Sequence, residues 1–234
     1  MLRFALSIAM ALPLLAKAPL GEVQTVVSER IDAAPGGAVR VIGTTGELDV
    51  EGWDRPEVEV TVTKSTWRRN SPESVEAARR MLNRFRAKLE RSQAGDILIT
   101  AAYPSWNPIT RPLRDRTAVS LQYVIKVPHR AHLVIRHESG DLRMEGLTGV
   151  IEASVLTGDI EWRVAEANPY AIDAKCRIGG VYSDFDGDHR AREVVGERFG
   201  HHADSSAQKA ELRVGLGGIQ ILKVPAIAAA PALP

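Results

Sequence analysis

The stretch ESGDLRMEGLTGVIEASVLTGDIEW, residues 138–162, contains one unit twice: a Gly-Asp pair followed by alternating apolar and polar residues. Glycine adopts backbone conformations closed to other residues, and Asp hydrogen-bonds its own backbone, so each pair predicts a tight corner. The alternation that follows predicts a half-buried strand. Related units occur at 45–50 (TGELDV), 178–181 (IGGV) and 216–221 (LGGIQI). The sequence therefore repeats one module, a corner followed by a strand.

The spacing of these corners predicts a stack of units. Four central glycines are separated by 18, 21 and 38 residues, and the last step is close to two repeats. A step near twenty residues holds two or three short strands, and each unit would stack on the one before it in sequence. We expect an all-β fold, a β-solenoid over residues 36–222, with a β-sandwich of tight hairpins as the alternative. The predicted corner residues are Gly46, Gly140, Asp141, Gly158, Asp159, Gly179 and Gly217.

Period-two alternation also predicts which side chains form the core, since residues that share one face of a strand are spaced by two. Pro128 cannot donate to a strand ladder and should end the longest of these strands. The expected core residues are Val41, Leu48, Val50, Val60, Ile99, Leu121, Ile125, Ile135, Leu142, Ile160 and Ile221.

One segment, at about 71–91, has helical rather than strand periodicity. Ser71 is placed to cap a helix and Pro72 to occupy its first turn. The apolar residues at steps of three and four are Val75, Ala78, Leu82, Phe85 and Leu89. The opposite face carries Arg79, Arg80, Arg84, Arg86 and Lys88. That basic face is interpreted either as a solvated surface or as a contact for anionic lipid or polysaccharide.

The N-terminus has the plan of a secretory signal peptide over residues 1–18. Arg3 precedes an apolar run at 4–15 that ends in small residues, although a buried helix is the alternative. Pro19 makes a poor cleavage site directly after residue 18, which leaves the mature start open. Export to the periplasm or cell surface is predicted. No cysteine follows the run to carry a lipid anchor, and no second apolar stretch predicts a transmembrane segment in the mature chain.

The remaining segments are expected to lie outside the regular core. Residues 19–35 form a lead-in, 103–116 a proline-rich loop, 183–210 an insertion or long loop, and 223–234 a disordered Ala/Pro tail. Cys176 is the only cysteine, so no intramolecular disulfide can form and packing must stabilise the fold.

Three segments together resemble a known family. They are TTGELDVEG (44–52), YVIKVP (123–128) and residues 138–162. Their order, with Val127-Pro128 followed by Leu133 and then by Gly-Asp units, is similar to that of the bacterial putative-adhesin family of exported β-solenoid domains, formally a domain of unknown function. The resemblance covers about residues 36–222. It implies a right-handed, single-stranded solenoid at the cell envelope whose molecular role is unassigned.

A calcium site is the strongest metal hypothesis. Asp184, Asp186 and Asp188, with His189, lie in SDFDGDH, where carboxylates two residues apart could converge on a hard cation. The spacing does not fit an EF-hand, and an acidic turn is the simpler interpretation. His201 and His202 are adjacent, which makes a poor zinc pair. No cofactor is expected.

Catalytic patterns are weak. There is no Gly-x-Ser-x-Gly elbow, and Cys176 falls in register with core positions, so its thiol should be buried and inert. The glycine run at 215–218 lacks the lysine and helix of a phosphate loop. Asp141 and Asp159 could act as a carboxylate pair on glycosides, but corner formation is the simpler role, with Glu47 at a looser equivalent position. The three histidines at 129, 132 and 137 are expected at the surface.

These observations favour a non-catalytic, exported module of the cell envelope that engages an unknown envelope protein or surface polymer. The formal net charge of +1 gives no whole-chain footprint for nucleic acid. The alternative is a carbohydrate-binding or carbohydrate-cleaving domain, for which exposed tryptophans would provide stacking platforms. Clustering of Trp53, Trp67, Trp106 and Trp162 beside carboxylates would favour that alternative, and scattering would count against it.

Overall fold

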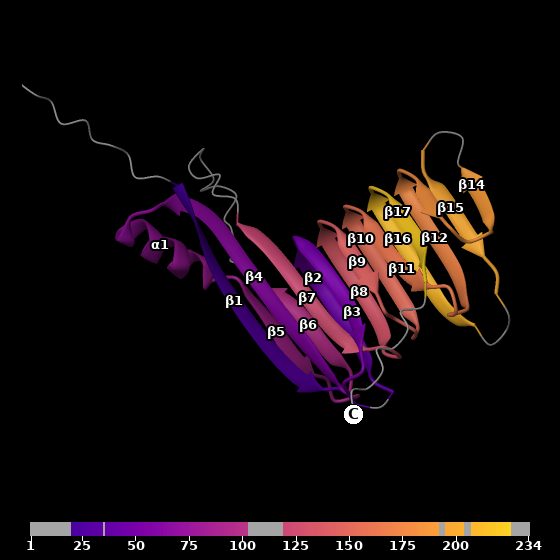
Figure 1. Cartoon of the computed structure of the whole chain (residues 1–234), viewed down its shortest axis with the longest axis horizontal. Helices are drawn as coiled ribbons and strands as arrows, with labels where there is room; N and C mark the ends of the chain where they lie inside the picture. Colours follow the sequence, from indigo (N-terminus) through magenta and orange to yellow (C-terminus); the bar gives the residue numbers. More distant parts are fainter. Residues whose placement is uncertain (1–19, 35, 103–118, 192–194, 204–206, 226–234) are drawn as a thin grey trace, which may run out of the picture.

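The computed structural model describes residues 20–34, 36–102, 119–191, 195–203 and 207–225 and shows an all-β fold with one helix and two mixed sheets (Figure 1). Sheet A contains, in spatial order, β1 (Leu20–Asp32), β4 (Glu57–Arg69), β7 (Ser120–Pro128), β3 (Glu47–Trp53), β9 (Leu142–Glu145), β11 (Ile160–Ala165), β17 (Ile219–Val224) and β13 (Val181–Ser183). Sheet B contains β14 (Asp188–Ala191), β15 (Glu197–His201), β12 (Tyr170–Ile178), β16 (Gln208–Leu216), β10 (Ile151–Thr157), β8 (His132–Ser139), β2 (Ala38–Thr45), β6 (Ile97–Ala102) and β5 (Arg86–Arg91). The all-β class is confirmed.

Consecutive strands alternate between the two sheets through the middle of the chain. From β8 to β13 each strand of sheet B is followed by a strand of sheet A. Neighbours in this region, such as β8 and β10 or β9 and β11, pair in parallel. Each Gly-Asp or Gly-Gly corner therefore carries the chain from one sheet to the other.

The units do not stack in sequence order, which corrects that expectation. The last unit, β16 with β17, lies between β10–β11 and β12–β13. Packing explains the insertion, because Leu212 of β16 lies in register between Ala153 and Ala174. Two residues earlier on β16, Ala210 lies between Ile151 and Ile172. Large and small side chains thus alternate across the stack, as close packing requires.

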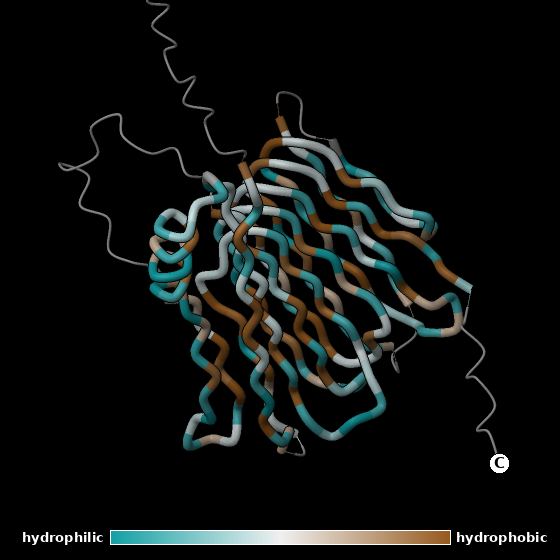
Figure 2. Tube along the Cα trace, turned by 60° about the vertical axis from the view of Figure 1, so that its left-hand side comes forward, coloured by the Kyte–Doolittle hydropathy of each residue, from teal (hydrophilic) through white to brown (hydrophobic). Residues whose placement is uncertain are grey.

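The core lies between the sheets, where the inward side chains of both form one cluster. All of the predicted core residues are buried. Figure 2 shows hydrophobic and hydrophilic residues alternating along the strands, as a two-faced sheet requires. The largest fully buried side chains include three aromatic residues that were not predicted in the core, Trp162, Tyr170 and Phe199.

The predicted helix is real but shorter than expected. Helix α1 spans Pro72–Leu82, and the Ser71 hydroxyl accepts a hydrogen bond from the Ser74 amide at 3.3 Å. The remainder of the predicted segment, Arg86–Arg91, is strand β5, antiparallel to β6. Part of the expected basic helical face therefore lies on a strand.

Three segments that were assigned outside the core belong to the sheets. The lead-in contains β1, which pairs with β4 along its whole length. The expected loop at 183–210 includes the antiparallel hairpin β14–β15, which extends sheet B beside β12. Strand β17 continues to Val224, so the tail begins later than predicted.

The remaining predictions concern parts of the chain that the structure does not describe. The signal peptide at 1–18, the whole 103–116 loop and residues 226–234 of the tail lie outside the described residues. Within the described residues, no helix is long and apolar enough to cross a membrane.

Candidate functional site

The repeat corners form a column along one edge of the molecule. A Cβ on Gly158 would lie 2.0 Å from the Gly140 carbonyl oxygen, and a Cβ on Gly140 would lie 2.0 Å from that of Gly46. Both residues have positive φ, +135° and +113°. The same close approach links Gly217 to Gly158 and Gly179 to Gly217. Glycine at these corners therefore lets the backbones of neighbouring units approach more closely than any side chain would allow.

The corner carboxylates bind the backbone of the neighbouring unit. The Asp159 amide donates to Asp141 Oδ1 at 3.1 Å, and the Gly218 amide donates to Asp159 Oδ1 at 2.6 Å. Each carboxylate therefore joins one unit to the next. This arrangement gives the two carboxylates a structural use and supplies no separate support for glycoside hydrolysis.

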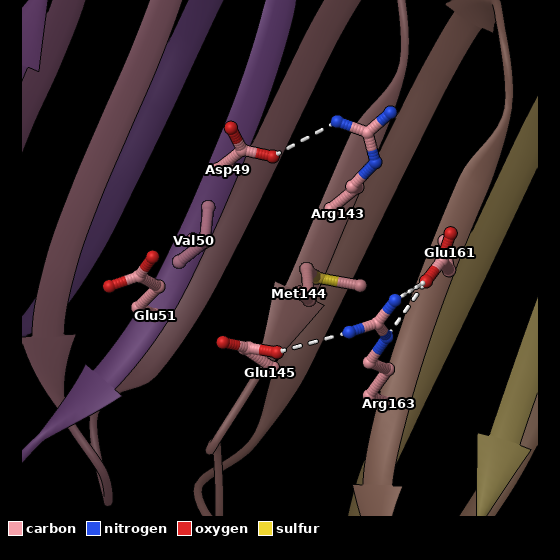
Figure 3. Close-up of a pocket in the computed structure, with 8 residues that line it drawn as sticks. All are labelled: Asp49, Val50, Glu51, Arg143, Met144, Glu145, Glu161 and Arg163. Atoms are coloured by element: carbon pink, nitrogen blue, oxygen red, sulfur yellow. Dashed lines mark hydrogen bonds and ion pairs between the residues drawn. The ribbon is translucent and has the colours of Figure 1, made fainter.

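The outer face of sheet A carries ion pairs between neighbouring strands (Figure 3). Arg143 lies 3.5 Å from Asp49, and Arg163 lies 2.8 Å from Glu161 and 3.7 Å from Glu145. They line a hollow of about 140 Å³ above Val50 and Met144. Lys126 pairs with the remaining acid of the hollow, Glu51, at 3.7 Å. Every charged side chain of this hollow has an opposite charge beside it.

The outer face of sheet B carries a hollow with a different charge balance. The basic hollow is shallow, with a volume of about 570 Å³. Its floor includes Ser154 and Gly215, which leave room above the strands, and the exposed side chain of Leu156. Its lining contains one acidic residue, Glu138. Its basic residues are Arg136, Lys175, Arg177 and Arg213.

Only one of the four cations is neutralised within the part of the chain that the structure describes. Arg213 lies 2.7 Å from Asp173 and 2.8 Å from Glu211. Burial alone would raise the pKa of Asp173, but hydrogen bonds from Arg198 and Arg213 hold it below its ordinary value. Across the described residues, the other three cations have neither an ion pair nor a hydrogen bond.

Strand register creates this basic hollow. Arg136 is aligned with Ser154, Ser154 with Arg213, and Arg213 with Lys175 across four adjacent strands. Sequence reasoning missed the group because its members are far apart in the chain. Outward-facing basic residues at alternating positions were the only available signal, and they become a cluster only when the strand order is known.

The calcium candidates do not converge. Asp184 accepts hydrogen bonds from the Tyr182 hydroxyl at 2.9 Å and from the Lys223 amide at 3.0 Å. The Asp186 carbonyl oxygen is hydrogen-bonded to the His201 ring. Among the described residues, no group of three or more His, Cys, Asp or Glu side chains is placed to hold a metal ion.

The described tryptophans are scattered. Trp162 is fully buried and packs edge-on against Tyr170 with 4.9 Å between ring centroids. Trp53 donates to the Glu57 carbonyl at 2.8 Å, while Trp67 is 62% exposed on another strand. Trp106 lies outside the described residues. These three described rings form no common stacking surface.

The structure also places the cysteine and the histidines. Cys176 is buried with Sγ 3.0 Å from the Gly217 carbonyl oxygen, and burial raises the pKa of its thiol. His129 and His132 are partly exposed, as expected. His137 corrects the prediction of a surface position, because it is 2% exposed and hydrogen-bonded to Thr44 at 2.7 Å. Its strand turns this ring inward at the end of the core.

No model of a known protein family matches the sequence, and no curated protein matches it. Among solved structures, a putative cell adhesion protein from Clostridium sporogenes is similar over 86% of this chain and 100% of its own, at 13% identity and a TM-score of 0.46. Putative adhesins from Bacteroides fragilis and Parabacteroides distasonis are similar over 85% of this chain and 97% of theirs, each at 8% identity and a TM-score of 0.23.

Proposed function

We propose that this chain is a non-catalytic, exported interaction module of the cell envelope, and that its basic hollow binds an anionic surface polymer. The observation that carries the proposal is the group of three cations, Arg136, Lys175 and Arg177, without an ion-pair partner in the described chain. Unpaired cations around one hollow attract anions, whereas the paired charges on sheet A largely cancel. Export rests on the signal-like residues 1–18.

The spacing of the cations favours an extended ligand. Arg136 and Lys175 lie on β8 and β12, which are separated by β10 and β16. At about 4.8 Å between neighbouring strands, the two positions are about 14 Å apart across the sheet. A repeating anion that crosses the strands can contact both, whereas one small anion cannot. Ser154 and Gly215, which have a small side chain and none, leave room for a polymer chain between these positions.

We further propose that the two sheets form a β-solenoid. Alternation of consecutive strands between the sheets, parallel pairing and stacked corners support this interpretation. A sandwich built from tight hairpins would instead pair consecutive strands antiparallel within one sheet. A solenoid suits a polymer-binding role because stacking produces a long surface with equivalent outward positions.

The test is binding of purified protein to polygalacturonate and to polyphosphate, with neutral dextran as the uncharged control. Replacing Arg136, Lys175 and Arg177 together with Gln should weaken binding at least about tenfold and reduce its salt dependence, because fewer counterions are displaced. The matched control replaces Arg79, Arg80 and Lys88 with Gln, which removes the same charge elsewhere.

The control variant should bind within about twofold of the parent protein. Equal losses in both triple variants would show that net charge, rather than the basic hollow, drives binding. Absence of binding to either polyanion, or equal binding to dextran, would overturn the proposal. Thermal unfolding of each variant confirms that the fold is retained.

A further inference from the structure

Besides the two hollows on the outer faces of the sheets, a cavity lies at the opposite end of the stack from the β14–β15 hairpin. This terminal cavity, of about 670 Å³, opens between β1 and β4 of sheet A and β5 and β6 of sheet B. Its volume is within the range of small-molecule sites. Its apolar lining residues are Val27, Val60, Val62, Ala87, Leu89 and Ala102. The walls therefore suit a hydrocarbon chain.

One charged side chain is buried in this apolar setting. Lys64 follows Val60 and Val62 on the inward face of β4 and is 4% exposed. Its Nζ donates to the Phe85 carbonyl oxygen at 2.9 Å. Burial, together with the nearby charge of Arg86, lowers the pKa of Lys64. An uncompensated buried ammonium is costly, so an anion beside it would be stabilised.

The charges around the cavity leave a place for such an anion. Among the described residues, no carboxylate forms an ion pair with Lys64. Glu90, which lines the cavity, is paired with Lys88 at 2.6 Å. Arg86 also lines the cavity and adds a second positive charge near the first. Glu29 is the other acid in the lining.

We propose that the terminal cavity binds a single-chain amphiphile with an anionic head, the head at Lys64 and Arg86 and the acyl chain against the valines of β1 and β4. Charge complementarity selects the head, since among the described lining residues the one deeply buried polar group, Lys64, is a cation. The apolar walls select the chain, because burial of methylene groups is favourable. This site is separate from the basic hollow and does not depend on it.

Isothermal titration calorimetry with decanoate, below its critical micelle concentration, tests the proposal. Decanoate and decyl phosphate should bind with a negative heat-capacity change, which marks burial of apolar surface. Decanol and decyltrimethylammonium have the same chain with a neutral or cationic head, and each should bind at least about tenfold more weakly. A preference between the two anions distinguishes a fatty acid from a phosphate headgroup.

Two pairs of variants locate the site. Lys64→Met keeps the apolar stem and removes the charge. It should weaken the binding of decanoate at least about tenfold and leave the binding of decanol unchanged. Lys209→Met, at an exposed lysine of β16 that does not line the cavity, is its control. Val27→Trp fills the cavity and should also abolish binding, whereas Val26→Trp on the other face of the same strand should not.

Three outcomes would overturn the assignment: no binding of either anionic amphiphile, equal binding of decanol and decanoate, or unchanged binding in Lys64→Met. Losing binding equally in Val26→Trp and Val27→Trp would also contradict it. Melting temperatures of the four variants establish that folding is intact. The triple variant of the basic hollow should bind decanoate normally, so failure of one proposal is distinguishable from failure of the other.

Discussion

At the scale of single residues, the corner column makes a sharp prediction for Gly158. Gly158→Ala combines an unfavourable φ with a Cβ that would lie 2.0 Å from a backbone oxygen, so we expect it to lower the free energy of unfolding by about 3 kcal/mol or more. Urea unfolding measures this loss. Gly36 has φ +77° with open space around it, so Gly36→Ala should cost only about 1 kcal/mol.

Gly200 provides the second control for this series. Its φ is not in the positive range, and a Cβ at this position would have no atom within 4 Å. Gly200→Ala should therefore change the free energy of unfolding by less than about 0.5 kcal/mol. Equal costs at all three positions would show that the close approach between corners contributes nothing specific.

His137 predicts a pH dependence of stability. Burial lowers the pKa of this ring, and the carbonyl groups of Gly46 and Gly140 offset that effect only in part. Because the folded pKa lies below the unfolded value of about 6.5, the unfolded state takes up more protons as pH falls. The free energy of unfolding should therefore be fully present above about pH 6.5 and decrease toward the folded pKa.

Urea titrations at several pH values between about 7.5 and 5.5 measure this slope. His137→Gln should flatten it, because the replacement does not titrate. His202→Gln, at an exposed ring, should leave it unchanged. A slope that persists in His137→Gln would assign the effect to other groups.

At the scale of elements, α1 is attached through a small cluster of its own. Leu82 is fully buried with Ala78 and Val23, apart from the main core. Leu82→Ala should cost about 2 to 4 kcal/mol locally. Because the cluster is separate, we expect the amides of α1 to lose hydrogen-exchange protection while those of β10 keep theirs.

The control for this prediction is Arg80→Ala, which removes an exposed ion pair to Glu76 at 3.6 Å. Such pairs contribute less than about 1 kcal/mol. Loss of protection in β10 as well as α1 would show that the helix supports the main core.

The end of α1 shows why local sequence patterns predicted that an element exists better than they predicted the residues at which it begins and ends. Ala87 and Leu89 face the core from a strand, but Leu89 also lies four residues after Phe85 and therefore fits a helical repeat. Pairing with β6 decides between the two, and such pairing is not visible in a local window. The hairpin at 183–210 was missed for the same reason, because its glycines and acids also suit a loop.

At the scale of the whole molecule, the sequence identified the strand faces and the corners but not the order of the units. The period-two pattern fixes which side chain faces inward, so the predicted core is buried throughout. The position of β16 depends on Leu212 fitting between Ala153 and Ala174, a match between distant segments. The basic hollow depends on that same order. The basic hollow therefore could not be predicted before the order of the strands was known.

The inserted unit predicts an unusual response to truncation. A chain that ends at residue 203 lacks β16 and β17, which are the partners of β12 and β13. In that chain β12 would keep only β15, whereas β10 and β11 would keep β8 and β9. Hydrogen exchange should therefore show protection lost throughout 170–201 and retained in β8–β11. A chain ending at 224 keeps every strand that the structure describes and should match the full protein. If the units were stacked in sequence order, β12 would pair with β10 and remain protected in the shorter chain, so retained protection there would refute the inserted arrangement.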